Sequence, residues 1–365
     1  MISGDNAVPR GFDGAFYNTL NGFHKFFERI DIICPYLRRP VRTKIFNNVF
    51  FHPLPPGRLL RPLFIFKKGW PIINQFKPEL IIAHAYGFQL MSLGGWLLAK
   101  KSRRPLVLEV MHVGGYPWAE SIRDWLERQI TFIFLKLFAA RAKIIRVINQ
   151  SEAELLSSWG IPGEKIRIIP AIYLDQIIFK PRPEIKKKYD LIFVGRLVTN
   201  KGLPLLLETF DSIKKTFPQL RLLVLGEGPL RFWLKKEIKK RQGITYLFSV
   251  PKMKDVARLY NESRVVICTS SAEGGPRFVV EAMACGLPAV STPVGLMKEI
   301  IKDGENGFLL KKWSAEEISE KIRELLRTKN LYEKCSKGAL AAASQFEYNK
   351  AISNYALTYV NLCGS

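Results

Sequence analysis

Short apolar segments alternate with longer amphipathic segments along the whole chain. Nearly continuous apolar segments are typical of parallel strands that are buried on both faces of a sheet. In chain order they are IDIICP, ELIIAHA, PLVLEVMH, AKIIRVIN and KIRIIPA, then DLIFVGRL, LRLLVLGEG, ITYLFSV, RVVICTS, LPAVST and GFLL. With Met1–Ser3 as a short first strand, each half of the chain has six strands. The pattern predicts an α/β protein with two doubly wound, Rossmann-like domains.

A segment without periodicity separates the two halves. Residues 173–190 contain Pro181, Pro183 and a run of three lysines, which interrupt both helical and strand patterns. The sequence therefore predicts one domain at 1–175 and a second at 176–345. The end of the chain has apolar residues at helical spacing, and we expect a helix at 346–365 that crosses back onto the first domain.

The one long uncharged segment, residues 80–99, contains a histidine, a glutamine and three glycines. We interpret it as a strand, a loop and a helix rather than as a membrane span. The first residues lack the basic-then-apolar pattern of a signal peptide. The five cysteines form no Cys-x-x-Cys pair, which argues against a zinc knuckle or a disulfide framework. These features predict a cytoplasmic protein.

The chain carries 56 Lys and Arg against 32 Asp and Glu, a formal net charge of +24, and both halves share the excess. Such a charge indicates a negatively charged partner, and nucleic acid, an anionic membrane surface and phosphorylated substrates all qualify. Hydrophobic residues make up 47% of the chain, which leaves no room for extensive disorder. The class of protein is globular.

Two acids flank a glycine-rich junction in the second half. Glu273 precedes Gly274-Gly275-Pro276, and Glu281 lies in the first turns of a helix that we expect to begin near Arg277 and to stop at Gly286. In an open parallel sheet, ligands bind where strands end and helices begin, and a helix amino terminus attracts phosphate. Carboxylates accept hydrogen bonds from vicinal hydroxyls. The junction therefore favours a nucleotide sugar, which has an anionic centre between two hydroxyl-rich groups.

Cations are expected at the same edge of the sheet. Arg196 and Lys201 follow the first strand of the second domain, in FVGRLVTNKG. Arg donates two parallel hydrogen bonds to phosphate, and Lys supplies a compact positive charge. We expect them to replace a divalent ion, because the sequence contains no Asp-x-Asp pair and no cluster of metal ligands. The prediction is a site with no metal and no cofactor.

These segments resemble those of the GT-B retaining glycosyltransferases of family 4. The resemblance covers nearly all of residues 188–365, through GRLVTNKG, LGEGPL, EGGPRFVVEAMACGLPAVST and DGENGFLL, while the first half matches mainly in its order of strands and helices. It implies that Arg196 and Lys201 bind the donor diphosphate. It also implies that Glu281 holds the ribose and that Glu273 contacts the sugar.

The resemblance implies further contacts. It places the nucleotide base near Val250-Pro251-Lys252, and in the first domain it implies that His112 faces the transferred sugar. It also places Gly11 and Gly14 in the loop for acceptor and donor phosphate. From the residues alone, these glycines are equally consistent with a simple turn, and His112 with a hydrogen-bonded strand end. The remaining implied donor contacts are Gly274, Gly275, Pro276, Arg277 and Phe278.

The sequence thus predicts a metal-independent retaining glycosyltransferase. It would move a hexose-type sugar from a nucleoside diphosphate to a hydroxyl of a glycan or lipid-linked acceptor, in a cleft between the domains. Two alternatives remain open: an epimerase on the same plan, which needs no acceptor, and a non-catalytic protein that binds nucleic acid or membrane. The carboxylates of Glu273 and Glu281 argue against a nucleic-acid partner, because a pure polyanion binder has no need of acids beside its cations.

Three segments of the first half, residues 39–51, 57–71 and 125–143, mix cations with large apolar side chains. Such segments either lie in a membrane interface or form core helices with solvated basic residues. For any one segment a core helix is slightly favoured, but attraction to anionic lipid of about 1 kcal/mol per basic residue would let a few such segments together hold the protein at a membrane. We therefore expect a lipid-linked acceptor rather than a soluble one, and a peripheral position on the inner face of the cytoplasmic membrane.

Overall fold

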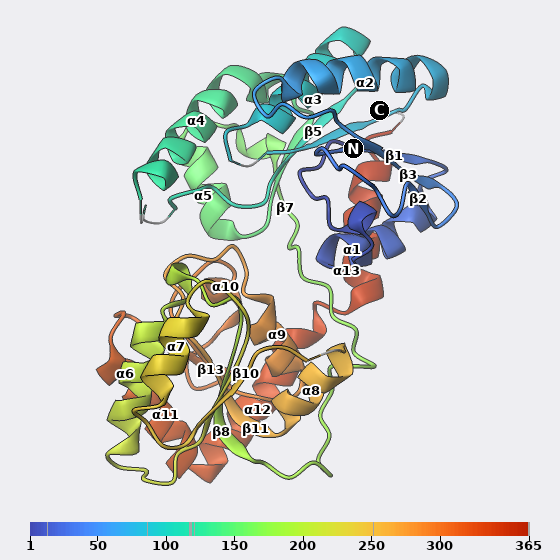
Figure 1. Cartoon of the computed structure of the whole chain (residues 1–365). Coiled ribbons are helices and arrows are strands. Elements are labelled where there is room, and N and C mark those ends of the chain that lie inside the picture. The colour runs from blue at the N-terminus through green and yellow to red at the C-terminus, as the bar shows by residue number, and fades with distance from the viewer. Residues whose placement is uncertain (13, 86, 117–118, 120, 251, 364–365) are drawn as a thin grey trace. The chain divides into compact units, whose positions relative to one another are not determined.

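The computed structural model describes all residues except 13, 86, 117–118, 120, 251 and 364–365 (Figure 1). It divides into two compact units. Unit 1 comprises Met1–Tyr173 and Asn349–Ser365, and unit 2 comprises Leu174–Tyr348. The sequence predicts domain limits after residues 175 and 345, and the units divide after residues 173 and 348.

Unit 1 is built on a sheet in two parts. One part has the strand order β1-β3-β2 and the other β4-β5-β6-β7, and every pairing is parallel except that of the edge strand β2 with β3. The strands are β1 (Ile30–Cys34), β2 (Lys44–Ile45), β3 (Val49–Pro53), β4 (Ile81–His84), β5 (Leu106–Val110), β6 (Ile144–Val147) and β7 (Ile166–Ile168).

Ile2 joins the two parts of this sheet. It forms parallel bridges to Ile33 of β1 and to Ala83 of β4. Its N–H donates to the carbonyl of Ile82 at 2.7 Å, and the N–H of Ser3 donates to the carbonyl of Ile33 at 3.0 Å. The short first strand therefore lies where the strand order reverses, which is the position of the ligand-binding crevice in doubly wound sheets.

The helices of unit 1 pack closely because small residues line their contacts. A Cβ atom on Gly94 of α3 would lie 2.7 Å from the Ile65 side chain of α2, and one on Gly69 would lie 2.5 Å from Leu98. Ser121 caps α4 and Asn149 caps α5, each by accepting a backbone N–H. The helices are α1 (Ala15–Phe23), α2 (Arg61–Phe76), α3 (Leu90–Ser102), α4 (Ile122–Phe138) and α5 (Gln150–Ser158), with 3₁₀ turns at Val8–Arg10, His24–Phe26, Ala139–Arg141 and Gly163–Lys165.

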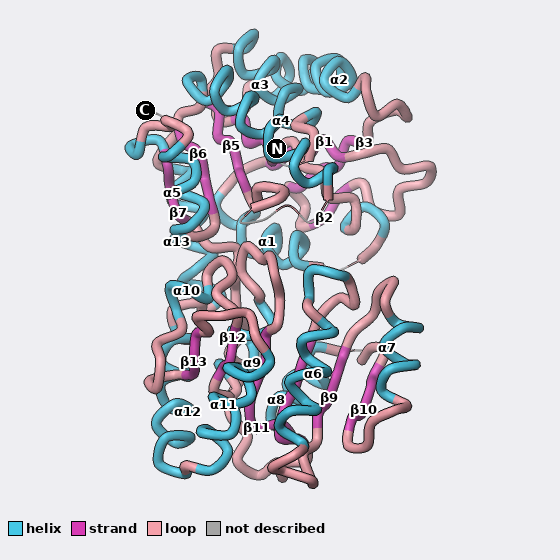
Figure 2. The backbone as a smooth tube through the Cα atoms, turned by 90° about the vertical axis from the view of Figure 1, so that its left-hand side faces the viewer, coloured by secondary structure: helices cyan, strands magenta, loops and turns pink. Residues whose placement is uncertain are grey.

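Unit 2 contains a parallel sheet of order β10-β9-β8-β11-β12-β13, and Figure 2 shows its strands side by side from β13 to β10. The order reverses between β8 and β11, as in a Rossmann-type sheet. The central strands are buried along their length, which explains their nearly continuous apolar sequences. The strands are β8 (Tyr189–Val194), β9 (Leu222–Leu225), β10 (Ile244–Leu247), β11 (Ser263–Cys268), β12 (Ala289–Ser291) and β13 (Gly307–Leu309).

Helices cover the sheet of unit 2, with α6 packed against α11, and with α8 and α12 packed against α9. Ser314 caps α11 by accepting the N–H of Glu317. The helices are α6 (Leu203–Lys214), α7 (Arg231–Ile238), α8 (Met253–Asn261), α9 (Arg277–Ala284), α10 (Met297–Ile300), α11 (Ala315–Arg327) and α12 (Lys329–Ser344), with a 3₁₀ turn at Thr199–Lys201.

The last helix, α13 (Tyr348–Val360), returns to unit 1 as predicted. Its Tyr355 and Tyr359 hydroxyls both donate to Oε1 of Glu109, a buried residue of β5. Arg146 of β6 donates to the same carboxylate at 3.2 Å, and its guanidinium lies 3.8 Å from the centre of the Tyr355 ring. Burial alone would raise the pKa of Glu109, but the charge of Arg146, the contact with His84 and the hydrogen bond from Tyr355 together outweigh burial and lower the pKa well below its usual value.

The strand pattern of the sequence is confirmed in unit 2 and only partly in unit 1. The sequence pattern does not predict β2 and β3, because their segment mixes aromatic, basic and asparagine residues without an apolar run. Residues 80–99 form β4, a loop and most of α3, as expected. Within the described residues, no helix combines the length and apolar character needed to cross a bilayer.

Candidate active site

The predicted donor residues lie at the carboxyl edge of the sheet of unit 2, where its strand order reverses. The loop that follows β8 carries Arg196 and Lys201, and the loop that follows the adjacent strand β11 carries Glu273. Helices α6 and α9 begin directly after these two loops. The fold thus brings together cations, an acid and two helix amino termini that are about 70 residues apart in the sequence.

Glycines let these loops approach each other. Gly202 has a positive φ of 63°, and a Cβ atom there would lie 2.0 Å from the carbonyl oxygen of Thr269. Gly226, in the loop after β9, similarly lies against the carbonyl oxygen of Gly195, which a Cβ would meet at 1.8 Å. These contacts need glycine at both positions, because any side chain would force the backbones apart.

Hydrogen bonds lock the loop after β8 onto the loop after β11. The N–H of Ser271 donates to the carbonyl of Asn200 at 2.8 Å, and the Asn200 side chain donates to the carbonyl of Ala272 at 2.9 Å. The hydroxyl of Thr269 donates to the carbonyl of Lys201 at 2.9 Å. The backbone around Lys201 and Glu273 is therefore held in one arrangement, as a preorganised site requires.

Lys201 and Glu273 form an ion pair inside this locked region. The Lys201 ammonium donates to Oε1 of Glu273, and the side chains are only 9% and 16% exposed. The hydroxyl of Ser270 donates to the same oxygen at 3.0 Å. The ammonium also lies 5.4 Å from the centre of the Phe278 ring, in the first turn of α9. A buried ammonium with hydrogen-bonding capacity to spare is suited to an anionic ligand group at this helix terminus.

Glu281 lies one turn further along α9 and is held by two side chains. Arg277 donates to its Oε1 at 2.8 Å, and the hydroxyl of Tyr260, at the end of α8, donates to its Oε2 at 3.3 Å. Burial raises the pKa of Glu281, and the charge of Arg277 opposes that rise. Each carboxylate oxygen keeps lone-pair capacity for a hydroxyl of a ligand.

The other predicted donor residues lie along the same edge. Arg196 is exposed in the loop after β8, and Gly274, Gly275 and Pro276 connect the Glu273 turn to the first residue of α9. Lys252 is the N-cap residue of α8, and Val250 precedes it after the edge strand β10. Pro251 lies outside the described residues.

Unit 1 holds the remaining predicted residues. Gly11 has a φ of 97° and ends the first 3₁₀ turn, so that its backbone favours glycine, whereas a Cβ on Gly14 would meet nothing within 4 Å. His112 follows β5, and its Nδ1 lies 3.3 Å from Oε1 of the buried Glu152 in α5. The loop after Ile2 and the end of β5 both belong to the carboxyl edge of this sheet.

Three partners of the site residues were not predicted from the sequence: Ser270 beside Glu273, Tyr260 beside Glu281, and Glu152 beside His112. Ser270 is the last residue of the segment RVVICTS, three residues before its partner, so that its position in the sequence could have indicated the contact. Tyr260 and Glu152 come from other elements, and no local pattern marks them.

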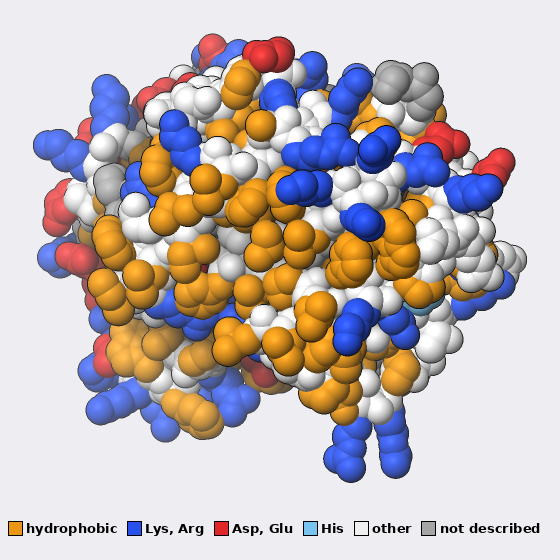
Figure 3. Space-filling model, turned by 90° about the horizontal axis from the view of Figure 1, so that it is seen from above, with side chains coloured by type: hydrophobic (Ala, Val, Ile, Leu, Met, Phe, Trp, Pro, Cys, Tyr) orange, Lys and Arg blue, Asp and Glu red, His pale blue; other side chains and the backbone are white. Residues whose placement is uncertain are grey.

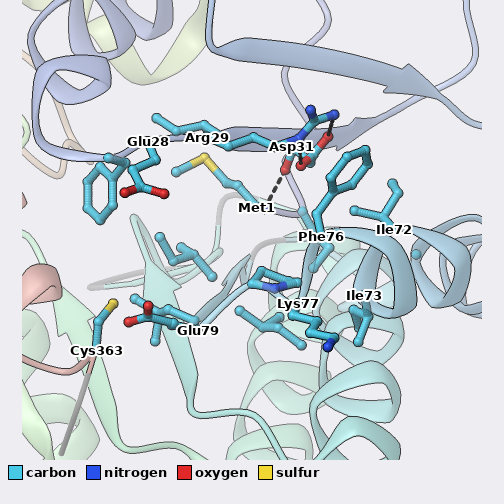
Figure 4. Close-up of a pocket in the computed structure, with 18 of the residues that line it drawn as sticks. Met1, Glu28, Arg29, Asp31, Ile72, Ile73, Phe76, Lys77, Glu79 and Cys363 are labelled. Atoms are coloured by element: carbon cyan, nitrogen blue, oxygen red, sulfur yellow. Dashed lines mark hydrogen bonds and ion pairs between the residues drawn. The ribbon is translucent and has the colours of Figure 1, made fainter.

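The described residues include no group of three or more His, Cys, Asp or Glu side chains that could hold a metal ion. A cavity of about 380 Å³ opens in unit 1 among residues such as Met1, Asp31, Phe76 and Glu79 (Figure 4). It lies at the amino ends of β1 and β4, where the Met1 ammonium donates to the carbonyl of Asp31 at 2.7 Å. This is the edge opposite to that where open α/β sheets bind their ligands.

Two family models match the chain and together cover most of it. Residues 16–171 match "Glycosyltransferase Family 4", and residues 175–341 match "Glycosyl transferases group 1". An uncharacterized glycosyltransferase of Methanocaldococcus jannaschii is 27% identical over 76% of this chain and 71% of its own length. The sulfoquinovosyl transferase SQD2 of Arabidopsis thaliana is 25% identical over 94% of this chain and 69% of its own.

Solved structures share the fold. Sucrose-phosphate synthase of Thermosynechococcus elongatus superposes with a TM-score of 0.82 at 18% identity, over 99% of this chain and 98% of the other. HepE of Anabaena, solved in complex with UDP-glucose, gives a TM-score of 0.75 at 19% identity over the same shares. The two doubly wound sheets, the glycine-rich loops at the carboxyl edge of unit 2 and these matches agree with one another. The chain belongs to the family 4 glycosyltransferases of GT-B fold.

Proposed function

We propose that this glycosyltransferase transfers a hexose-type sugar from a nucleoside diphosphate to an acceptor hydroxyl, with retention of the anomeric configuration and without a divalent metal ion. The observation that carries the proposal is the Lys201–Glu273 ion pair at the amino terminus of α9. It combines a cation for phosphate with an acid for hydroxyls at one sheet edge, which is the pattern that a nucleotide sugar needs.

The departing diphosphate would be stabilised by the cations of this edge. As the glycosidic bond breaks, negative charge develops on the leaving oxygen, and fixed positive groups lower the barrier most when they are already in place. Arg196, Lys201 and the first N–H groups of α9 supply such charge without a metal ion. Among relatives of this fold, HepE of Anabaena was solved with UDP-glucose and the pneumococcal GtfA with UDP and GlcNAc, which supports a nucleoside diphosphate as leaving group.

The acids would bind the sugar groups on either side of the diphosphate. Glu281 accepts ribose hydroxyls while Arg277 and Tyr260 hold its carboxylate in place. Glu273 accepts hydroxyls of the transferred sugar, and the hydrogen bond from Ser270 orients it. Retention follows the resemblance to the family: the acceptor hydroxyl attacks the developing oxocarbenium ion from the face that the diphosphate leaves.

A lipid-linked acceptor at an anionic membrane is supported by the surface of unit 1. On α4, the apolar side chains of Ile122, Leu126, Ile133 and Leu137 are 74%, 42%, 53% and 66% exposed, at spacings of one or two helical turns. Leu59, just before α2, is 83% exposed. Seen from the side of α2, α3 and α4, apolar side chains form continuous areas bordered by Lys and Arg, with most acids towards the margins (Figure 3). Such a surface fits a bilayer with anionic head groups.

The experiment is a transfer assay with donor-site variants. A thermal-shift panel of UDP-, GDP- and ADP-sugars first identifies the donor, because a ligand at 100 times its dissociation constant adds about 2.7 kcal/mol of stability. We expect Lys201→Ala and Glu281→Gln each to lower kcat/KM about 10²- to 10³-fold, while EDTA changes nothing. Lys215→Ala, an exposed lysine at the far end of α6, is the matched control.

The outcomes separate the alternatives. Turnover near that of the wild type in Lys201→Ala or Glu281→Gln would refute the site. A donor that changes its sugar configuration without any acceptor, measured by mass spectrometry and chromatography of the nucleotide sugar, would indicate an epimerase instead. Loss of transfer in EDTA, restored by Mg²⁺ or Mn²⁺, would refute the metal-independent step.

A further inference from the structure

We infer that Glu152 is a positioning residue for His112, and that it fixes the ring so that Nδ1 carries the proton and Nε2 presents a lone pair. The inference rests on the proposed function and on the resemblance to the family, which implies that His112 faces the transferred sugar. It goes beyond that proposal because it gives a role to Glu152, a buried acid that belongs to none of the motifs described above. Three observations carry it: the contact, the burial of the acid, and the construction of the helix that presents it.

The contact joins two loops at the carboxyl edge of unit 1. His112 follows β5, Glu152 is the third residue of α5 after the adjacent strand β6, and Nδ1 lies 3.3 Å from Oε1. The side chain of His112 is 41% exposed, whereas that of Glu152 is only 2% exposed. The ring therefore has one nitrogen against a buried acid while much of its surface stays accessible to a ligand.

The same loop is tied to α5 a second time. Downstream of His112, the hydroxyl of Tyr116 donates to the carbonyl of Ser151 at 3.3 Å, and its N–H donates to the carbonyl of Val113 at 3.1 Å. The loop is thus held against α5 by the Tyr116 side chain as well as by the contact of His112 with Glu152. A ring aligned by both backbone and side chain loses little further freedom on binding a ligand.

Burial of the Glu152 carboxylate costs free energy, and the need to cap α5 does not account for an acid at this position. Burial raises the pKa of Glu152, and the contact with His112 and hydrogen bonds from the backbone at Ile148 and Val113 only oppose that rise. The cap of α5 is made by Asn149, whose side chain accepts the N–H of Glu152 at 2.8 Å. An apolar side chain at position 152 would leave that cap intact. A buried acid whose side-chain partner is an accessible histidine is typical of a functional site.

An acceptor at Nδ1 decides which nitrogen of a neutral imidazole carries the proton. The carboxylate accepts the Nδ1–H, and Nε2 is left as an acceptor for a hydroxyl of the ligand. Without that acceptor, the ring would be free to take either tautomer and to turn about its side-chain bonds. Glu152 therefore acts on the reaction only through His112.

The test combines ¹⁵N NMR of the His112 ring with kinetics of Glu152→Leu, Glu152→Gln and Asn149→Ala. We expect the wild type to show the Nδ1–H form. Glu152→Leu should lose this preference, and its kcat should fall at least about tenfold. Glu152→Gln, whose Oε1 still accepts a hydrogen bond, should keep most of the Nδ1–H preference and most of the activity. Asn149→Ala, which removes the cap and keeps the acid, lowers the unfolding temperature but leaves the spectrum unchanged.

A double variant separates positioning from folding. In a His112→Ala background, Glu152→Leu should cost no further activity, because its effect passes through the ring. An equal loss in both backgrounds, or an unchanged Nδ1–H signal in Glu152→Leu, would overturn the inference. If His112→Ala itself turns over like the wild type, the proposed role of His112 in the site fails, and the spectrum alone decides whether Glu152 fixes the tautomer.

Discussion

The ion pair of Lys201 with Glu273 would take part in the chemistry of the proposed function. A diphosphate at the start of α9 would offer oxygens to an ammonium that Glu273 already binds. Since an ammonium has three donor hydrogens, Lys201 can hold the acid and a phosphate at once. It would then fix the distance between the leaving group and the carboxylate that binds the sugar. Substituting either partner should disturb both ends of the donor.

Asp31 of β1 makes the stability of unit 1 depend on pH. Burial would raise the pKa of Asp31, but hydrogen bonds from His52 at 2.8 Å and Arg29 at 2.7 Å outweigh burial and lower the pKa to about 2. A carboxyl whose pKa falls on folding stabilises above its ordinary pKa of 3.8, and this stability disappears as the pH falls towards 2. Asp31→Asn should therefore cost about 2 kcal/mol at pH 7.

Urea unfolding followed by circular dichroism at pH 7 and pH 2.5 checks this prediction. The difference between wild type and Asp31→Asn should shrink at the lower pH. Asp211→Asn is the control, because Asp211 forms an exposed pair with Arg241 at 2.8 Å and is itself 44% exposed. Exposed pairs contribute little. A difference for Asp31→Asn that stays constant with pH would contradict the assigned cause.

At the residue scale, the sequence was informative where the chemistry is local. Arg196 and Lys201 share one loop, and Glu273 and Glu281 share one strand-loop-helix junction, so that spacing alone indicated a common edge. Tyr260 and Glu152 touch their partners across different elements. A single tyrosine or glutamate in an amphipathic helix has no signature of its own, and such contacts appear only once the elements are packed.

At the scale of elements, α13 is anchored to unit 1 by hydrogen bonds to the buried carboxylate of Glu109. The Tyr355 and Tyr359 hydroxyls donate to Glu109, which also binds Arg146. Hydrogen bonds to charged groups contribute about 1.5–3 kcal/mol each. Tyr355→Phe and Tyr359→Phe should each lower the unfolding temperature by several degrees, and amide exchange along α13 should accelerate.

Tyr332→Phe provides the comparison in unit 2. Its hydroxyl donates to the carbonyl of Arg264 at 3.1 Å, a neutral hydrogen bond worth only about 1 kcal/mol. The loss should be smaller, and exchange along α13 should stay as in the wild type. Equal effects of Tyr332→Phe and Tyr355→Phe would show that the charge of Glu109 adds nothing.

The sequence predicted the strands that contain a continuous apolar run, but it did not predict β2 and β3 of unit 1. β3 carries His52 and Pro53, and β2 has only two residues, Lys44 and Ile45, so that neither produces an apolar run. Of the two, β2 is the edge strand; it has one partner, and its sequence need not be apolar. The return of α13 was predictable from its apolar spacing, but its anchoring to Glu109 and Arg146 was not, since buried charges are rare in strands.

At the scale of the whole molecule, the net charge of +24 and the exposed apolar side chains of unit 1 predict a specific response to lipid. The protein should sediment with phosphatidylglycerol vesicles and not with phosphatidylcholine vesicles, and added salt should release it. The double variant Ile133→Ser, Leu137→Ser should weaken binding several-fold, because two exposed side chains of α4 no longer enter the interface.

The matched control is Ile177→Ser, which removes an apolar side chain that is 80% exposed in unit 2. It should bind vesicles like the wild type. Equal binding to neutral and anionic vesicles, or an equal loss in both variants, would show that the basic and apolar surface over α2, α3 and α4 does not direct the protein to a membrane.

Unit 1 is made from two stretches of chain that flank the whole of unit 2, and this order has a consequence during translation. Residues 1–173 are synthesised before unit 2, yet the tyrosines that cover Glu109 and Arg146 are synthesised after it. Unit 2 is continuous and has completed its final strand by Leu309. A nascent chain therefore carries a unit 2 that can fold beside an unfinished unit 1, and chaperones would be needed most at that stage.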